Sequence, residues 1–178
     1  MIVDIFLHPA IPVFIGSILI FFSKEKSNLI SVGALLVSLY VLLFFSDNKD
    51  LIYTLSSSNL GNETHLSLHY YSYSKLGFLF CLVYLIIGIL GKLFSMYREN
   101  YIEKSLVLIY IGSAISVIFS GDFLTFYIFW ELMAIASTFI IWSSDTTESH
   151  SAGVRYLLIH LFGGIVLLIG IVGLLINT

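Results

Sequence analysis

The sequence predicts an all-α membrane protein with six transmembrane helices, and three observations indicate this fold class. Of the 178 residues, 58% are hydrophobic and only 11% are charged, whereas about a quarter of the residues of an ordinary soluble domain are charged. The apolar residues gather in six runs, each close in length to the roughly 20 residues that a helix needs to cross a bilayer. Short polar segments and one longer loop separate these runs. We therefore treat residues 1–178 as a single transmembrane helical domain.

The six predicted helices cover residues 5–22, 29–45, 76–94, 105–120, 123–142 and 154–176. The N-terminus opens with an acidic residue and not with the basic region of a signal peptide, so we expect the first run to be retained as a span. Only the stretch SGD joins the fourth helix to the fifth, which predicts a tight antiparallel hairpin with Asp122 as N-cap of the fifth helix. Gly112, Ser116 and Ser120 recur every four residues and predict a close-packing helix face.

The distribution of basic residues predicts that both termini lie outside. Cytoplasmic segments carry an excess of lysine and arginine. If the N-terminus is outside, six of these residues lie on the inner side and two on the outer side. The inner ones are Lys24, Lys26, Lys92, Arg98, Lys104 and Arg155, and the outer ones are Lys49 and Lys75. The loop 46–75 then faces outward, and its segment THLSLHYYSYS alternates with a period of two after LIYTL and a polar turn. This pattern predicts a small extracytoplasmic β-hairpin between the second and third helices.

Composition and spacing exclude several classes of site. A net charge of -3 without a basic cluster gives no support to a nucleic-acid partner. Cys81 is the sole cysteine, so neither an intrachain disulfide nor a cysteine-based metal site is expected. His65 and His69 have a spacing that suits a metal ion on a helix. The local alternation predicts a strand, which would separate them by about 13 Å. With no third ligand evident, we predict neither a metal nor a cofactor.

Glu131 is the one charged residue in the run FLTFYIFWELMAIASTFIIW. It lies about 12 Å from the start of the predicted fifth helix, near the middle of a hydrocarbon core about 30 Å thick. A charged side chain there costs about 2.5 to 3.5 kcal/mol on insertion scales, and a role in an ion or proton pathway is the default hypothesis. The alternative is a hydrogen-bonded carboxyl group that only ties two helices together. Tyr127, one turn away, has a hydroxyl group that could hydrogen-bond the carboxylate.

His160 in the sixth helix is a second candidate, since histidine titrates near neutral pH. Counted from residue 154, it lies about 9 Å from the inner boundary of the membrane. Glu131, about 12 Å from the outer boundary of a core about 30 Å thick, lies about 18 Å from the inner one, so the two residues differ in depth by about 9 Å. That separation predicts a relay between Glu131 and His160 through water and not by direct contact. The alternative for His160 is a hydrogen bond to neighbouring backbone or hydroxyl groups. Arg155 is expected at the inner boundary as an anchor, or as a charge that biases an inner half-channel.

Two motifs carry a resemblance to a known family. SGDFLTFYIFWELMAIASTFIIW followed by AGVRYLLIHLFGGIVLLIGI resembles the proton-conducting membrane subunits shared by multisubunit sodium/proton antiporters and respiratory complex I. The likeness is greatest to the D-type branch of the antiporter subunits. The resemblance implies that Glu131 belongs to a proton pathway, with His160 as a further member. Tyr127 and Arg155 are the supporting candidates that the residues themselves indicate. The resemblance also implies an outside N-terminus and a multi-pass protein of a bacterial inner membrane.

The resemblance further implies a transporter subunit and not an enzyme. Family members usually have about fourteen helices, including one whose lysine partners the fifth-helix glutamate, so this chain resembles the N-terminal part. We therefore expect partners within a multisubunit complex in the lipid membrane, including a chain that supplies the missing helices. The expected function is proton translocation, with sodium as the exchanged ion. Two alternatives stay open: a structural, non-transporting subunit or truncated remnant, and an antiporter-like subunit of a NADH-quinone oxidoreductase or membrane hydrogenase complex.

Overall fold

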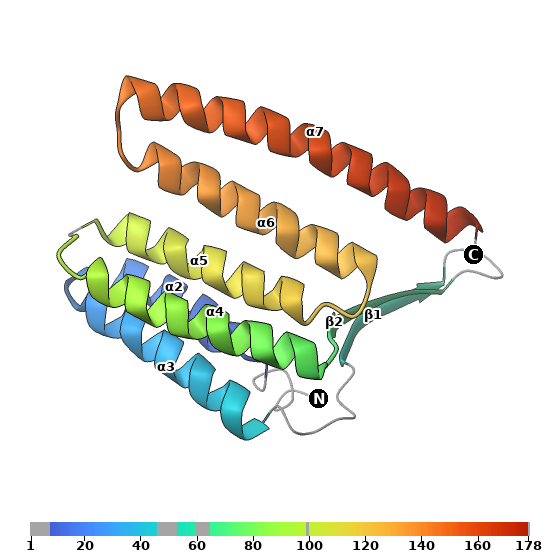
Figure 1. The fold of residues 1–178 in the computed structure, drawn as a ribbon, viewed down its shortest axis with the longest axis horizontal. Helices are drawn as coiled ribbons and strands as arrows, with labels where there is room; N and C mark the ends of the chain where they lie inside the picture. Colours follow the sequence, from blue (N-terminus) through green and yellow to red (C-terminus); the bar gives the residue numbers. More distant parts are fainter. Residues whose placement is uncertain (1–7, 46–52, 60–64, 99, 178) are drawn as a thin grey trace.

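The computed structural model describes residues 8–45, 53–59, 65–98 and 100–177. Within these ranges the chain forms six α-helices, one short 3-10 helix and two strands (Figure 1). The elements are α2 (Ala10–Phe22), η1 (Lys24–Lys26), α3 (Ser27–Phe45), β1 (Tyr53–Asn59), β2 (His65–Tyr71), α4 (Lys75–Phe94), α5 (Tyr101–Ile118), α6 (Phe123–Trp142) and α7 (Thr147–Asn177). The all-helical membrane architecture predicted from hydropathy is confirmed.

Five of these helices, all except α2, are long and apolar enough to cross a membrane. The helix α2 has 13 residues, about 20 Å at 1.5 Å per residue, which is less than a full crossing. Residues 5–7 of the predicted first span lie outside the described ranges. The chain is therefore a multi-pass membrane protein, and the crossing by its first helix stays a prediction.

Side-chain caps explain where several helices begin. The Ser74 hydroxyl accepts a hydrogen bond from Gly77 N at 2.9 Å and starts α4. The Asn100 side chain accepts from the backbone N–H groups of the first turn of α5, which therefore starts four residues before the predicted position. The predicted N-cap Asp122 is confirmed, because its Oδ1 accepts from Thr125 N at 2.7 Å. These local bonds satisfy donors that a helix leaves unpaired at its N-terminus.

The start of α7 differs from the prediction by seven residues, at Thr147 instead of residue 154. Thr146 and Ser149 explain the difference, since each backbone N–H donates to the other residue's hydroxyl at 3.0 Å. This reciprocal pair is a capping arrangement, and it begins the helix in a polar segment that hydropathy alone does not mark. The resulting helix of 31 residues is about 46 Å long.

The helix α5 occupies the centre of the bundle (Figure 1). On one side it packs against α6, and on the other against α2 and α4. The helix α7 lies at the outer edge against α6. The predicted small-residue face of α5 is used for close packing, because a Cβ added at Gly112 would lie 3.0 Å from the ring of Phe14 in α2. Buried side chains of α5, including Leu108 and Ile115, form the middle of the core.

The strands β1 and β2 pair antiparallel in the segment where the sequence predicts a hairpin. Residues 46–52 and 60–64 of the predicted loop lie outside the described ranges. Three hydrogen bonds join β2 and the residue after it to the α5–α6 turn: His69 N to Asp122 Oδ2 at 2.6 Å, Gly121 N to His69 O at 2.8 Å, and Ser72 N to Phe119 O at 2.6 Å. The strand pair is thereby fixed to the end of the bundle that carries this turn.

Six basic residues, Lys24, Lys26, Lys92, Arg98, Lys104 and Arg155, lie toward the opposite end of the bundle, near the α2–α3, α4–α5 and α6–α7 connections (Figure 1). Lys75 begins α4 at the end that carries the strands, and Lys49 lies outside the described ranges. Lys92 and Lys104 are not loop charges, since they are only 5% and 6% exposed. The six charges therefore lie in the half of the bundle nearest these connections, with Arg155 eight residues into α7, and two of them are part of the packed bundle.

Candidate functional site

Glu131 lies near the middle of α6, eight residues after its start at Phe123 and eleven before its end at Trp142. It is the one charged residue of this helix, and its side chain is 16% exposed. Ala134 and Thr138, three and seven residues after it on α6, are buried. The rise of the helix places the carboxylate about 12 Å from one helix end and about 16 Å from the other. The prediction of a carboxylate deep in the membrane-spanning region agrees with this position.

His160 of α7 faces this carboxylate directly. Its Nε2 atom lies 3.8 Å from Glu131 Oε1, and its side chain is 13% exposed. The predicted separation of about 9 Å in depth is therefore wrong. The reason is the early start of α7, which places His160 thirteen residues into its helix, about 20 Å from the α6–α7 turn, whereas Glu131 lies about 16 Å from the same turn. The two antiparallel helices thus bring both groups to one level.

Gly164 makes room for the Glu131 carboxylate. It lies one turn after His160 in α7 and is buried, and a Cβ added at this position would collide with Glu131 Oε1. The neighbouring Gly163 has no atom within 4 Å of the equivalent point. Only one of the two consecutive glycines therefore belongs to the site. The pair of glycines in the sequence indicates close packing of α7 against a neighbour, but it does not show which of the two glycines faces α6.

Aromatic rings surround the histidine on the other side. The centroid of the Trp130 ring lies 4.3 Å from that of His160, and the Tyr156 ring stacks on the histidine at 6.0 Å. These rings restrict the orientation of the imidazole. Glu131 Oε1 and His160 Nε2 are both buried and have no hydrogen-bond partner among the residues that the structure describes. The pair is thus enclosed, with one lone oxygen and one lone nitrogen facing each other.

The two supporting residues of the prediction lie apart from this pair. Within the described ranges, Tyr127 donates no hydrogen bond to the buried Glu131 Oε1. Arg155 is exposed on α7, five residues before His160. The roles of Tyr127 as a hydrogen-bond donor and of Arg155 as a biasing charge stay predictions.

The other candidate ligands do not form a cluster. His65 and His69 belong to strand β2, as the alternation predicts. Over the described ranges, no group of three His, Cys, Asp or Glu side chains could hold a metal ion. His8 belongs to another environment, where its Nδ1 accepts from Ala10 N at 3.0 Å and its ring packs edge-on against Tyr71.

Sequence reasoning missed the burial of two lysines. Lys104 Nζ donates to Ser27 Oγ at 3.2 Å, across α5 and α3. Lys92 of α4 is buried as well. Both lysines lie within about one turn of a helix end. Exposed lysines are common at the ends of membrane helices, so the sequence alone does not distinguish these two buried lysines from exposed ones.

A carboxylate and an imidazole facing each other at 3.8 Å can share a proton. The distance exceeds the 2.5 to 3.2 Å of protein hydrogen bonds, so a small side-chain rotation is needed to join the two atoms. Histidine exchanges protons near neutral pH, and a buried carboxyl group changes its protonation state when a charge nearby changes. The arrangement is therefore suited to holding and passing a proton in the middle of the bundle.

Comparison with known proteins finds similar sequences among membrane antiporter subunits. Residues 120–178 match the family described as "NADH:quinone oxidoreductase/Mrp antiporter, TM", and this range contains Glu131, His160 and Gly164. The chain is 32% identical over 165 residues to the Na(+)/H(+) antiporter subunit A1 of Staphylococcus aureus, a match that covers 84% of this chain and 20% of the relative. The A1 subunit of strain JH9 is 33% identical over 144 residues, covering 72% and 18%. The chain thus spans about a fifth of the length of these curated relatives.

One solved structure shares the fold. A chain of the membrane-bound sulfane sulfur reductase, an archaeal respiratory membrane complex, superposes with a TM-score of 0.73 at 21% identity. The match covers 94% of this chain and 36% of that one. The likeness to the D-type branch stays a prediction, because the curated relatives named above are A1 subunits. Residues 120–178 are therefore similar in sequence to the antiporter-like membrane family of NADH:quinone oxidoreductases and Mrp antiporters.

Proposed function

We propose that this chain is part of a proton-translocating membrane complex, with sodium/proton antiport as its activity and Glu131 as an intramembrane proton site. The observation that carries the proposal is the enclosed pair of Glu131 Oε1 and His160 Nε2 at 3.8 Å. The names of the S. aureus relatives, which are sodium/proton antiporter subunits, support the choice of ions.

The chemistry follows from the two groups. A proton on His160 Nε2 can pass to Glu131 Oε1 when the side chains close the gap, which leaves a neutral imidazole and a neutral carboxyl group. A cation that approaches the site favours the charged carboxylate, and its departure favours the protonated form. Movement of a cation near Glu131 would therefore release and reload the proton. We propose that His160 is the immediate exchange partner, and that Tyr127 and Arg155 act around the pair without touching it.

We further propose that both chain termini lie outside and that the strand pair is extracytoplasmic. The location of the six basic residues in one half of the bundle supports this orientation under the positive-inside rule. The site also supports the need for partners, because α7 packs on α6 at the edge of the bundle. Its other side carries exposed apolar residues such as Ile159 and Phe162, at 74% and 73%. Further subunits in a bacterial inner membrane would cover part of this face.

The test is Glu131→Gln in the assembled complex, in vesicles that report proton and sodium flux. Glutamine keeps the size and hydrogen-bonding capacity of the side chain but cannot release a proton at physiological pH. Flux should therefore fall to background while assembly is kept. The matched control is Glu148→Gln, at an exposed position in the first turn of α7, which should transport normally. Normal flux in Glu131→Gln would show that the carboxyl group only ties α6 to α7.

A second candidate function is membership of a redox-driven complex, which the family description supports by naming NADH:quinone oxidoreductase. The two functions differ in what drives proton movement. An antiporter moves protons when a sodium gradient is imposed without a redox substrate, whereas a redox-driven complex requires electron transfer. Flux measured under each condition separately, with Glu131→Gln as the negative control, distinguishes them.

A further inference from the structure

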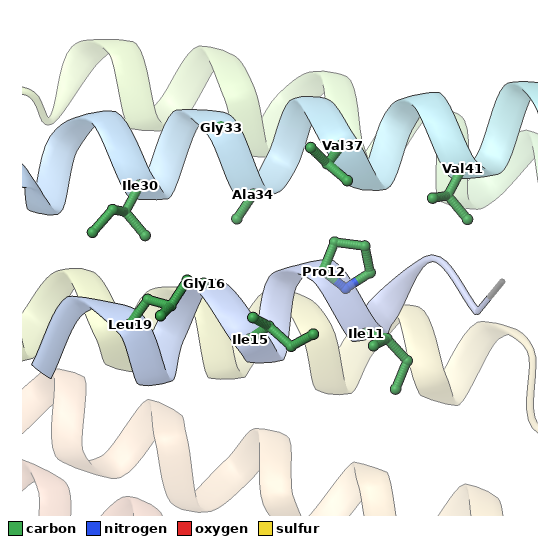
Figure 2. Close-up of a pocket in the computed structure, with 10 residues that line it drawn as sticks. All are labelled: Ile11, Pro12, Ile15, Gly16, Leu19, Ile30, Gly33, Ala34, Val37 and Val41. Carbon is green, nitrogen blue, oxygen red and sulfur yellow. The ribbon is translucent and has the colours of Figure 1, made fainter. Parts of the chain in front are cut away.

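A groove between α2 and α3 (Figure 2) is lined by residues of these two helices, whereas the Glu131 site lies between α6 and α7. Its volume is about 480 Å³, and its lining residues are all apolar or glycine. The two helices approach closely where Gly16 meets Ala34, since a Cβ added at Gly16 would collide with the Ala34 side chain. This contact is lined on either side by larger residues, among them Ile15, Leu19, Ile30, Val37 and Val41.

The groove is open to the surroundings and has the length of one bilayer leaflet. Ile15, Leu19 and Val37 are 41%, 47% and 51% exposed, and a Cβ added at Gly33 would meet no atom within 4 Å. From Ile30 to Val41 the lining extends over eleven residues of α3, which is about 16 Å. Half of a hydrocarbon core about 30 Å thick is about 15 Å. The groove thus matches the depth that one acyl chain occupies.

One end of the groove is positively charged. Leu19 and Ile30 stand at this end, where η1 (Lys24–Lys26) joins α2 to α3. Lys24 and Lys26 are exposed, with Glu25 as the one acidic residue between them. The Lys24 ammonium group lies 4.5 Å from the centroid of the Tyr101 ring at the start of α5, a cation–π contact. Basic residues near a membrane surface attract anionic lipid headgroups.

We propose that this groove binds an anionic glycerophospholipid, with one acyl chain along α2 and α3 and the phosphate group at Lys24 and Lys26. The charge at one end of the groove favours an anionic lipid over an apolar helix of another subunit, because exposed lysines near a membrane surface attract anionic headgroups. An acyl chain is narrower and needs no hydrogen-bond partner, which suits the apolar lining.

The headgroup part of the proposal is tested by native mass spectrometry of the full chain with phosphatidylglycerol or phosphatidylcholine of identical acyl chains. The wild type should prefer phosphatidylglycerol. Each lysine near the surface contributes about 1 kcal/mol, or about fivefold in affinity, so Lys24→Gln with Lys26→Gln should lower the phosphatidylglycerol affinity about 25-fold and leave phosphatidylcholine unchanged. The matched control, Lys75→Gln at the opposite end of the bundle, should bind as the wild type does. An unchanged preference in the double variant would overturn the headgroup site.

The acyl-chain part is tested with Gly33→Leu, which fills the groove at a position with free space and should lower the binding of both lipids at least tenfold. Gly170→Leu on α7 is the control, because a Cβ there also meets no atom within 4 Å. A photo-crosslinker on Val37→Cys in native membranes identifies the occupant, and a lipid adduct supports the proposal. Equal lipid binding by the two leucine variants, or a protein adduct at Val37→Cys, would refute it.

Discussion

Replacing Gly164 by alanine should disable the proposed proton site without removing either of its titrating groups. The added Cβ would collide with Glu131 Oε1, and carbon and oxygen atoms need about 3.5 Å of separation. The flexible end of the glutamate has to rotate away, which takes its carboxylate out of line with His160 Nε2. A displacement of about 1 Å in a reacting group can cost about a hundredfold in rate. We therefore expect proton flux to fall between about tenfold and a hundredfold.

Gly163→Ala is the control for this variant. Both substitutions lie in the interior of α7, and both gain about 0.5 to 1 kcal/mol of helix propensity. They differ in what the new methyl group meets, since the point at Gly163 has no atom within 4 Å. Any difference between the two variants therefore reports the contact with Glu131. Gly163→Ala should transport within about twofold of the wild type, because no side chain has to move.

The assay is proton uptake into membrane vesicles that contain the assembled complex, followed with a pH-sensitive dye and normalised to the amount of assembled protein. Gly164→Ala should assemble normally, because the group that it displaces is the end of a flexible side chain and not backbone. Equal flux in the Gly163→Ala and Gly164→Ala vesicles would refute the reasoning that the facing of Glu131 and His160 matters for transport.

Three further substitutions test the packing that holds the site. Asp122→Ala removes both the N-cap of α6 and the acceptor of a bond from β2, and should cost about 2 to 4 kcal/mol of stability. Gly112→Leu forces a side chain against the Phe14 ring, and should cost about 1 to 3 kcal/mol by overpacking. Lys104→Met should change stability by less than about 1 kcal/mol, because an apolar side chain of similar length replaces a buried ammonium group that donates a hydrogen bond to Ser27 Oγ.

All three can be measured on the purified chain by thermal unfolding with a thiol-reactive fluorogenic dye. Cys81 is the sole cysteine and is fully buried, so dye labelling reports the opening of the core. For a protein of this size, 1 kcal/mol shifts the melting temperature by about 2 to 4 °C. The controls are Glu25→Ala, Gly170→Leu and Lys75→Met, at exposed positions. If Asp122→Ala melts at the same temperature as Glu25→Ala, or Gly112→Leu at the same temperature as Gly170→Leu, the contact assigned to that residue is contradicted. For Lys104→Met the contradicting result is the opposite one, a melting temperature well below that of Lys75→Met.

The sequence by itself determined the membrane class, the approximate place of all six helices, the cap at Asp122 and the place of Glu131 near the middle of an apolar helix. These features depend on local patterns: runs of apolar residues, capping side chains and a lone charge in a long apolar run. The boundary of α7 was wrong because Thr146 and Ser149 begin the helix by hydrogen bonds between polar side chains and backbone, and hydropathy does not detect such a start.

Only the tertiary structure decided which groups meet. The level of His160 relative to Glu131 depends on where both helices begin and how they pair, so a seven-residue error in one boundary turned a 3.8 Å contact into a predicted gap. Gly163 and Gly164 are equivalent in sequence. Only the rotation of α7 about its axis relative to α6 decides that Gly164, and not Gly163, contacts the Glu131 carboxylate. The burial of Lys104 likewise depends on the approach of α3 to α5. Local patterns specify single helices, whereas contacts between helices depend on relative rotation and depth, which no local pattern encodes.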